Sequence, residues 1–426
     1  MGSRRYSCYI FQIAIIVYIL GAAFYLIGRN INLPSTVTSS NKSLWSSLNT
    51  YNTNPQLGAA RHDPNFNKQP SSYVIDPPDH PFKMKVDLPA ATNTTQRQAA
   101  AFIVLVRNSE LFGMLQSMQD VEQRFNNKFN YPWVFLNEEP FTKEFIDTTT
   151  SVASSKTHYG LVNESMWGYP DWIDQKHAAD MRLEMKGLPY GTSESYRHMC
   201  RFQRHPLVLS LNLEYYWRVE PDVRYFCDLD YDPFLYMKQN NKKYAFNISF
   251  KEHSGTIPTL WENIKQFAKN STENGKVYFK NAYKDSLLNF LSYDGGQNYN
   301  GCHFWTNFEI ARLDLWHTEA YQELFSALDK SGGFFYERWG DAPIHSIFAA
   351  LYLSKDEVHF FNDIGYKHST YQHCPAEESL IRRCSCDPKA SLDFGDRMSC
   401  LIEYMEARDF NPVDEKRTVN DILISK

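Results

Sequence analysis

A strand–helix–strand pattern near residue 100 places this chain in the α/β class. Residues 101–106 form an unbroken apolar run, which is typical of a strand buried on both faces. Asn108 and Ser109 can then cap a helix. Apolar residues follow at helical spacing: Leu111, Leu115, Met118, Val121 and Phe125. A second apolar run at residues 133–136 completes the unit, so we expect a mostly parallel central sheet with right-handed crossovers.

The N-terminal region predicts a membrane anchor followed by a stem. Residues 8–27 are apolar and uncharged, and twenty such residues can just span a bilayer. A cleaved signal peptide is the alternative, but residues 25–27 make a poor cleavage site. Arg4 and Arg5 place residues 1–7 in the cytosol by the positive-inside rule. Residues 28–97, rich in Ser, Thr, Asn and Pro, are then a lumenal stem ahead of one folded domain at 98–426.

Glycosylation sequons and cysteines fit a lumenal location. Five Asn-x-Ser/Thr sequons occur, at Asn41, Asn93, Asn163, Asn247 and Asn270. Seven cysteines follow the apolar segment, and an oxidising lumen predicts disulfides with at least one free thiol left over. We expect the tail to be held by bridges among four of them: Cys374, Cys384, Cys386 and Cys400. A zinc cluster is the alternative, although Cys-x-Cys is not the usual Cys-x-x-Cys ligand pair.

The charge of the chain gives no sign of a polyanionic partner. Its formal net charge is -5, so we expect neither nucleic acid nor an anionic membrane surface to be bound electrostatically. Substrate contacts must therefore come from local groups.

One acidic turn is a candidate metal site. The strand-like residues 215–219 end in Glu220, Pro221 and Asp222. Open α/β sheets bind ligands at the carboxyl ends of their strands, where oxygen ligands can hold a divalent cation beside a diphosphate. The alternative is an ordinary acidic turn in which Pro221 is only a turn former.

Four further side chains stand out as polar groups within aromatic segments: Tyr196, Glu309, Asp341 and His368. An isolated buried carboxylate is costly, so Glu309 needs a partner or a task. His368 can offer a neutral imidazole to a metal.

Three of these residues also have a purely structural interpretation. Glu309 can form an ion pair with Arg312, and Asp341 can cap a helix that starts at Pro343. His368 can be a core histidine whose hydrogen bonds are satisfied.

Taken together, the chain resembles the fungal Golgi α-1,2-mannosyltransferases of the KTR family, glycosyltransferase family 15. The resemblance covers residues 101–400 and rests on long strings such as RVEPDVRYFCDLDYDPF, YNGCHFWTNFEI and ERWGDAPIHS. It implies a GT-A-like fold, GDP-mannose as donor, and Mn²⁺ as cofactor. It also implies retaining transfer of mannose to a mannose hydroxyl of N- or O-linked glycoproteins, by a single-pass type II protein of the Golgi membrane. The domain at 98–426 is then the catalytic mannosyltransferase domain.

The resemblance also implies roles for individual residues. Glu220 and His368 correspond to the metal ligands, and Glu309 takes the place of the family's proposed nucleophile. Tyr196 and Asp341 correspond to residues at the nucleotide and the reacting centre. Contacts to the nucleotide are expected from Arg107 and Asp222.

The chain departs from the family pattern at one place. A Ser-Gly-Phe-Phe segment usual in the family is missing after Phe202, where Gln203 leads directly into Arg204. This departure keeps open a weakly active, glycan-binding subunit of a Golgi complex. Mannosylphosphate transfer, which uses the same donor, is a second alternative within the transferase class.

Overall fold

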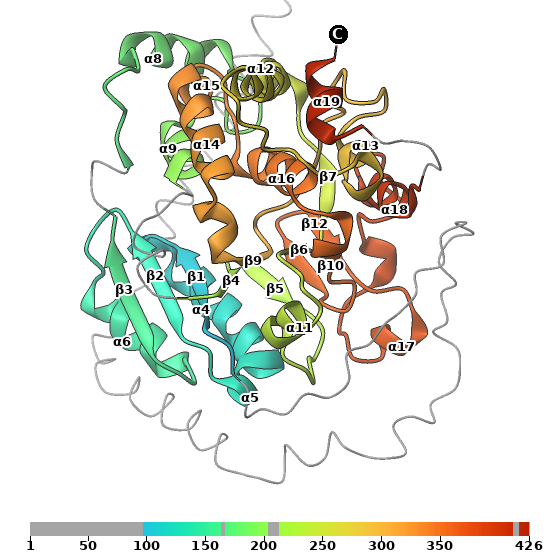
Figure 1. Cartoon of the computed structure of the whole chain (residues 1–426). Helices are drawn as coiled ribbons and strands as arrows, with labels where there is room; N and C mark the ends of the chain where they lie inside the picture. The colour runs from blue at the N-terminus through green and yellow to red at the C-terminus, as the bar shows by residue number, and fades with distance from the viewer. Residues whose placement is uncertain (1–96, 163–166, 203–212, 412–416, 426) are drawn as a thin grey trace, which may run out of the picture. The chain divides into compact units, whose positions relative to one another are not determined.

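The computed structural model describes residues 97–162, 167–202, 213–411 and 417–425, which all belong to one unit spanning 73–426 (Figure 1). The expected anchor, almost all of the stem and the sequons at Asn41, Asn93 and Asn163 lie outside the described residues. So does the segment after Phe202 where the family pattern is interrupted. Within the described ranges, no helix has both the length and the apolar character needed to cross a bilayer.

A seven-stranded sheet forms the centre of the domain, in the order β10-β6-β9-β4-β1-β2-β3. Its strands are β1 (Ala100–Leu105), β2 (Trp133–Asn137), β3 (Thr157–Leu161), β4 (Tyr215–Arg218), β6 (Tyr244–Phe246), β9 (Glu309–Arg312) and β10 (Val358–Phe360). Only β9 runs antiparallel to its neighbours in this sheet. The prediction of a mostly parallel sheet is therefore confirmed.

The first helical segment carries the predicted apolar face but begins differently. It consists of a 3₁₀ turn, η3 (Asn108–Glu110), then α4 (Leu111–Val121), and a π-helical turn, η4 (Glu122–Asn126), that contains Phe125. The expected caps are wrong, because Arg107 is the N-cap residue of the first turn. The Asn108 side chain instead donates to the carbonyl of Pro140 and accepts from the N–H of Thr142. These hydrogen bonds join the loop after β2 to the helix.

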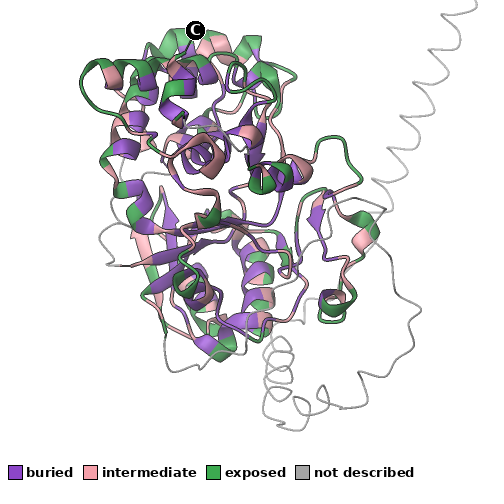
Figure 2. Cartoon of the chain, turned by 45° about the vertical axis from the view of Figure 1, so that its right-hand side comes forward, coloured by how far each residue is buried: buried purple, intermediate pink, exposed green. Residues whose placement is uncertain are grey.

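Helices cover both faces of the sheet. On one face lie α4, α5 (Asn127–Phe129), α6 (Lys143–Val152) and α11 (Pro233–Gln239), and on the other lie α12 (Leu260–Glu273), α14 (Glu319–Ser331) and α16 (Asp341–Tyr352). Side chains alternate between the two cores along each strand, so Tyr216 packs in one and Trp217 in the other. Figure 2 shows the buried sheet between helices whose outer faces are exposed.

The remaining elements surround this frame. The helices are α8 (Gln175–Glu184), α9 (Glu194–Phe202), η5 (Ser254–Thr256), η6 (Tyr283–Asp285), α13 (Leu288–Leu291), η7 (Leu313–His317), α15 (Gly333–Tyr336), η8 (Lys355–Glu357), α17 (Glu378–Ile381), η9 (Pro388–Ala390), α18 (Leu401–Asp409) and α19 (Val419–Ile424). A small antiparallel sheet joins β5 (Val223–Tyr225), β11 (Tyr366–His368) and β12 (Tyr371–His373). Strands β7 (Ser249–Lys251) and β8 (Cys302–Phe304) form a further pair.

Three disulfides fasten the C-terminal part of the chain to these strands. The bridges are Cys227–Cys384, Cys302–Cys400 and Cys374–Cys386, and Cys200 is a buried free thiol. The predicted free thiol is confirmed, but only Cys374–Cys386 lies within the tail. The prediction for the other two tail cysteines is wrong. An isolated bridge pairs Cys384 with Cys227 beyond β5, and Cys400 follows a segment paired with β7, the partner of β8.

The two described sequons differ sharply in exposure. Asn247 is fully buried, and its side-chain amide donates to the carbonyl of Ile364 at 3.3 Å. Asn270 is exposed on α12. A glycan at Asn247 is incompatible with this fold, whereas Asn270 stays available.

Candidate functional site

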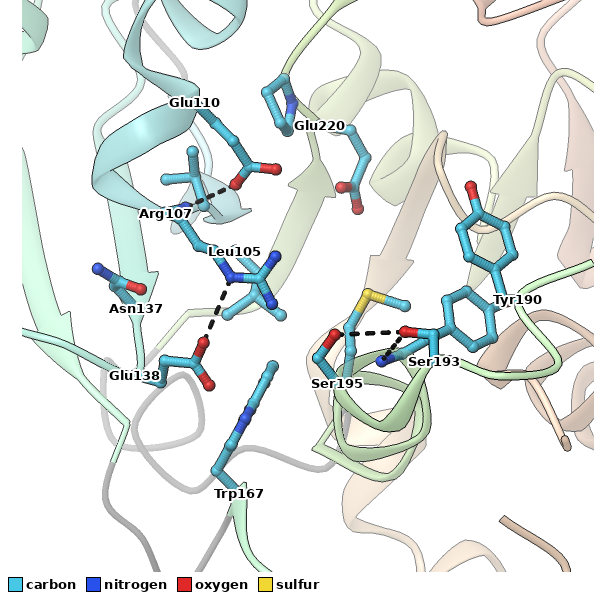
Figure 3. A pocket seen from close by; sticks show the side chains of 14 residues that line it. Leu105, Arg107, Glu110, Asn137, Glu138, Trp167, Tyr190, Ser193, Ser195 and Glu220 are labelled. Atoms are coloured by element: carbon cyan, nitrogen blue, oxygen red, sulfur yellow. Dashed lines mark hydrogen bonds and ion pairs between the residues drawn. The ribbon is translucent and has the colours of Figure 1, made fainter. Parts of the chain in front are cut away.

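A cavity of about 260 Å³ lies at the carboxyl ends of β1, β2 and β4. Strand β1 has β4 on one side and β2 on the other, so chain connections leave it in opposite directions along the sheet. Such a switch point is where open α/β sheets bind ligands. The wall includes Arg107 after β1, Glu138 after β2 and Glu220 after β4 (Figure 3). Helix α9 adds Tyr196.

Arg107 links the segments that follow β1 and β2 in the cavity wall. Its backbone N–H donates to Glu110 at 2.7 Å, and its Nε donates to Glu138 at 3.3 Å. Half of the Arg107 side chain is still exposed at the cavity. The guanidinium can therefore meet an anionic ligand, as the predicted nucleotide contact requires.

The acidic turn separates its two carboxylates. Glu220 faces the cavity, whereas Asp222 is exposed and does not line it. Asp222 has a left-handed backbone (φ 59°), and its N–H donates to the carbonyl of Gly113 at 3.1 Å. A Cβ on Gly113 would lie 2.4 Å from the Asp222 carboxylate, so glycine in α4 permits this close approach.

The tertiary structure brings His368 to the same turn. Strand β11 pairs with β5 so that His368 lies opposite Val223, the residue after Asp222. Its Nδ1 contacts the amide of Asn307 at 3.0 Å, and Trp305 stacks on its ring at 5.4 Å. Burial, and then the positive charge of Arg218, lower the pKa of His368. The neutral imidazole that a metal needs is thus favoured.

Arg218, which the sequence analysis did not identify, links the acidic turn to Asp341. Its Nε donates to Glu220 and its Nη1 to Asp341, both at 2.5 Å, and the residue is 6% exposed. Thr306 donates to the same Asp341 oxygen at 2.8 Å. Arg218 ends β4 and Glu220 follows two residues later, so the same-face spacing of an extended chain could have revealed the pair.

This arrangement shifts the pKa values of the two carboxylates in opposite directions. Burial raises the pKa of Glu220, although Arg218 opposes that shift. Burial also acts to raise the pKa of Asp341, but Arg218 and then His345 outweigh it, and the pKa lies below its usual value. With both carboxylates ionised, Arg218, Glu220 and Asp341 together carry an excess negative charge. The carboxylate oxygens and the nearby imidazole suit a divalent cation, which would also allow a diphosphate to bind here.

Glu309 lies deeper than the cavity wall. It faces Arg218 across the β4–β9 pairing and is 1% exposed. Its Oε1 accepts from the Tyr216 hydroxyl, and Nδ1–H of His345 donates to its Oε2 at 3.0 Å. The alternative of an ion pair with Arg312 is wrong, because Arg312 binds Asp314. Glu309 is not among the residues that line the cavity described above.

The side chain of Tyr196 lines the cavity, whereas that of Asp341 does not. The Tyr196 ring stacks on Tyr190 with centroids 4.4 Å apart. Asp341 is the first residue of α16, and Gly340 is the N-cap residue. The predicted capping of a helix that starts at Pro343 is therefore wrong, since the Asp341 carboxylate binds Arg218 instead.

An open sheet with a cavity at its switch point, lined by an arginine and a carboxylate, is the arrangement expected of a transferase of the nucleotide-sugar class. The sequence matches the glycolipid 2-alpha-mannosyltransferase family over residues 49–409. The chain belongs to this family, the α-1,2-mannosyltransferases of glycosyltransferase family 15.

Individual relatives agree with this membership. Glycolipid 2-alpha-mannosyltransferase 2 of Candida albicans is 51% identical over 320 residues, which are 73% of this chain and 67% of the relative. Alpha-1,2 mannosyltransferase KTR1 of Saccharomyces cerevisiae is 50% identical over 319 residues, covering 73% of this chain and 78% of that protein.

Solved structures share the fold. Core-mannan synthase A of Aspergillus fumigatus, in a Mn/GDP form, superimposes with a TM-score of 0.68 at 35% identity, covering 81% of this chain and 95% of the other. Ktr4p of Saccharomyces cerevisiae in complex with GDP gives a TM-score of 0.69 at 30% identity, covering 85% and 93%.

Proposed function

We propose that this chain transfers mannose from GDP-mannose to a mannose hydroxyl, forming an α-1,2 linkage with retention of configuration. The observation that carries the proposal is the cavity at the sheet switch point, with Glu220 in its wall and His368 beside the same turn. Family membership and the similarity to structures that hold GDP support the same donor. The domain would then be GT-A-like.

Glu220 and His368 are the residues that would hold Mn²⁺, which supplies Lewis-acid stabilisation of the departing diphosphate. Arg107 contributes a positive charge on the opposite wall, where it can bind phosphate or ribose oxygens. Arg218 orients Glu220 and Asp341 together, so that the acidic turn and the start of α16 keep a fixed separation.

Tyr196, which lines the cavity, would contact the sugar hydroxyls, while Asp341 would act from behind the wall through its bonds to Arg218 and Thr306. Asp341 has a lowered pKa and so stays an acceptor, while Tyr196 offers a hydroxyl at the cavity wall. Glu309 fits an electrostatic role better than direct attack, because both of its oxygens are bonded inside the core. Its charge would stabilise the oxocarbenium-like centre while the acceptor enters on the face that the diphosphate leaves.

The acceptor and the cellular location are part of the proposal. The apolar segment at residues 8–27, with Arg4 and Arg5 before it, supports a type II protein of the Golgi membrane with a lumenal catalytic domain. Three disulfides agree with an oxidising lumen. Mannosylated glycoproteins carrying N- or O-linked chains are then the acceptors.

The test is incubation of the purified protein with GDP-mannose, Mn²⁺ and methyl α-mannoside, followed by linkage analysis of the product. We expect a disaccharide with an α-1,2 bond, formed only when the chelator EDTA is absent. A product that contains phosphate would favour mannosylphosphate transfer. Binding of GDP without any product would favour the weakly active subunit.

A further inference from the structure

A buried ion pair behind the cavity contacts Tyr196. Arg338, in the turn between α15 and α16, is 2% exposed. Its Nη2 donates to Glu252 Oε1 at 2.9 Å and its Nη1 to Glu252 Oε2 at 3.3 Å. Nη1 also lies 3.4 Å from the hydroxyl oxygen of Tyr196, and the guanidinium carbon is 5.4 Å from the centre of the Tyr196 ring.

The contact fixes which way the Tyr196 hydroxyl can donate. A guanidinium has donors only, so the Tyr196 oxygen must accept from Arg338. The phenolic proton then points away from Arg338. The buried Cys200 thiol also lies beside this hydroxyl, but sulfur is a weak acceptor. Since Tyr196 is one of the residues that line the cavity, a bound sugar or phosphate oxygen would be the better acceptor for that proton.

Further contacts hold Arg338, Glu252 and Tyr196 in this arrangement. The backbone N–H of Arg338 donates to Thr256 at 3.0 Å, and the N–H of His253 donates to Glu252 at 2.7 Å. A Cβ on Gly340 would lie 3.5 Å from the Tyr196 oxygen and 3.6 Å from Nη1 of Arg338, so the turn closes over both groups. Tyr190 covers one face of the Tyr196 ring.

Electrostatics point the same way. Burial raises the pKa of Tyr196 well above its usual value, while the charge of Arg338 acts in the opposite direction. Burial also disfavours the charge on Arg338 itself, but Glu252 outweighs this and raises the pKa of Arg338. The guanidinium of Arg338 therefore stays charged beside a neutral phenol. The Tyr196 hydroxyl stays protonated and can donate a hydrogen bond.

We propose that Arg338, held by Glu252, is a positioning residue that fixes the Tyr196 hydroxyl as a hydrogen-bond donor to the substrate in the cavity. This inference rests on the proposed mannosyl transfer. Arg338 acts only through Tyr196, so its contribution to turnover must disappear when the Tyr196 hydroxyl is removed.

A double-mutant cycle tests this dependence. Wild type, Tyr196→Phe, Arg338→Gln and the double variant are compared for kcat, KM for GDP-mannose and melting temperature. We expect Arg338→Gln to lower kcat by about ten-fold or more, with KM changed by less than about three-fold. In the Tyr196→Phe background the same change should alter kcat by less than about two-fold. Equal losses in both backgrounds would overturn the proposal.

A second, largely buried ion pair provides the control. Arg201, on the same helix as Tyr196, binds Asp329 with two hydrogen bonds of 2.7 and 3.0 Å. Arg201→Gln should lower the melting temperature but change kcat by less than about two-fold in either background. If it lowers kcat as much as Arg338→Gln does, the effect is general destabilisation and the proposal fails.

If Arg338→Gln does not fold, Glu252→Gln replaces it in the double-mutant cycle. This variant preserves shape but removes the charge that holds the guanidinium, and it should again lower kcat only when the Tyr196 hydroxyl is present. Calorimetric titration with GDP and Mn²⁺ checks that each variant retains its cavity. A wild-type protein that binds GDP but forms no mannoside would refute the proposed function, whereas additive losses in an active enzyme would refute only this inference.

Discussion

Nδ1 of His345 lies 3.0 Å from Oε2 of Glu309, and both side chains are buried. The carboxylate is therefore held within the core, while its charge remains close to Arg218 on the neighbouring strand. Glu309→Gln keeps the shape of the side chain and removes that charge. We expect kcat to fall by about 10²-fold with little change in the Kd for GDP. Steady-state kinetics and a melting curve measure the two effects, and a destabilised variant with nearly full turnover would show that Glu309 is only structural.

Gly113 of α4 lies against the acidic turn. A methyl group there would meet the Asp222 carboxylate at 2.4 Å, so Gly113→Ala should displace that carboxylate and, with it, the turn that carries Glu220. We expect Mn²⁺ affinity in the presence of GDP to fall by about ten-fold, although alanine is the better helix former. Electron paramagnetic resonance of free Mn²⁺ follows the binding directly. Gly395→Ala is the control, because no atom lies within 4 Å of its Cβ position, and unchanged affinity in both variants would contradict the prediction.

The Cys302–Cys400 disulfide closes a long loop and joins β8 to the start of α18. Replacing both cysteines with serine should lower the free energy of unfolding by about 2–5 kcal/mol. Urea denaturation provides the measurement. Thiol labelling of the denatured, unreduced protein should modify Cys200, and labelling of the native protein should spare it because it is buried. Labelling at any of the six bridged positions would contradict the assigned pairing.

Asn270 and Asn247 form a matched pair of sequons. Asn270→Gln should remove one N-glycan and increase gel mobility, because this residue is exposed on α12. Asn247→Gln should leave the mobility unchanged but lower the melting temperature, because the buried amide bonds Ile364. A mobility shift in the Asn247 variant would mean that this region is not packed as described.

His373 links stability to pH. Its Nδ1 contacts Asp393 and its Nε2 contacts the carbonyl of Asn362, each at 2.9 Å. Burial lowers the pKa of His373, but the Asp393 charge and both hydrogen bonds outweigh it and the pKa is raised. Its stabilising contribution is therefore complete below the unfolded pKa of about 6.5 and is lost as pH rises through the higher folded value. His373→Gln should lower the melting temperature more at pH 5.5 than at pH 8.5. A larger decrease at pH 8.5 would contradict this prediction.

Patterns of neighbouring residues determined much of the architecture. The apolar runs predicted β1 and β2, and helical spacing predicted the face of α4, because such periodicities depend only on residues close in the chain. The acidic turn followed from its place at the end of the strand-like run that forms β4. Family strings then identified most of the candidate site residues.

Only the tertiary structure decided which distant groups meet. Glu309 is bonded to Tyr216 and His345, which lie 93 and 36 residues away along the chain. Cys227 pairs with Cys384 across 157 residues, and Asn247 is buried despite its sequon. A local pattern sets the face on which a side chain lies, but its partner depends on strand order and helix packing. These contacts therefore emerged only once the sheet and its helices were assembled.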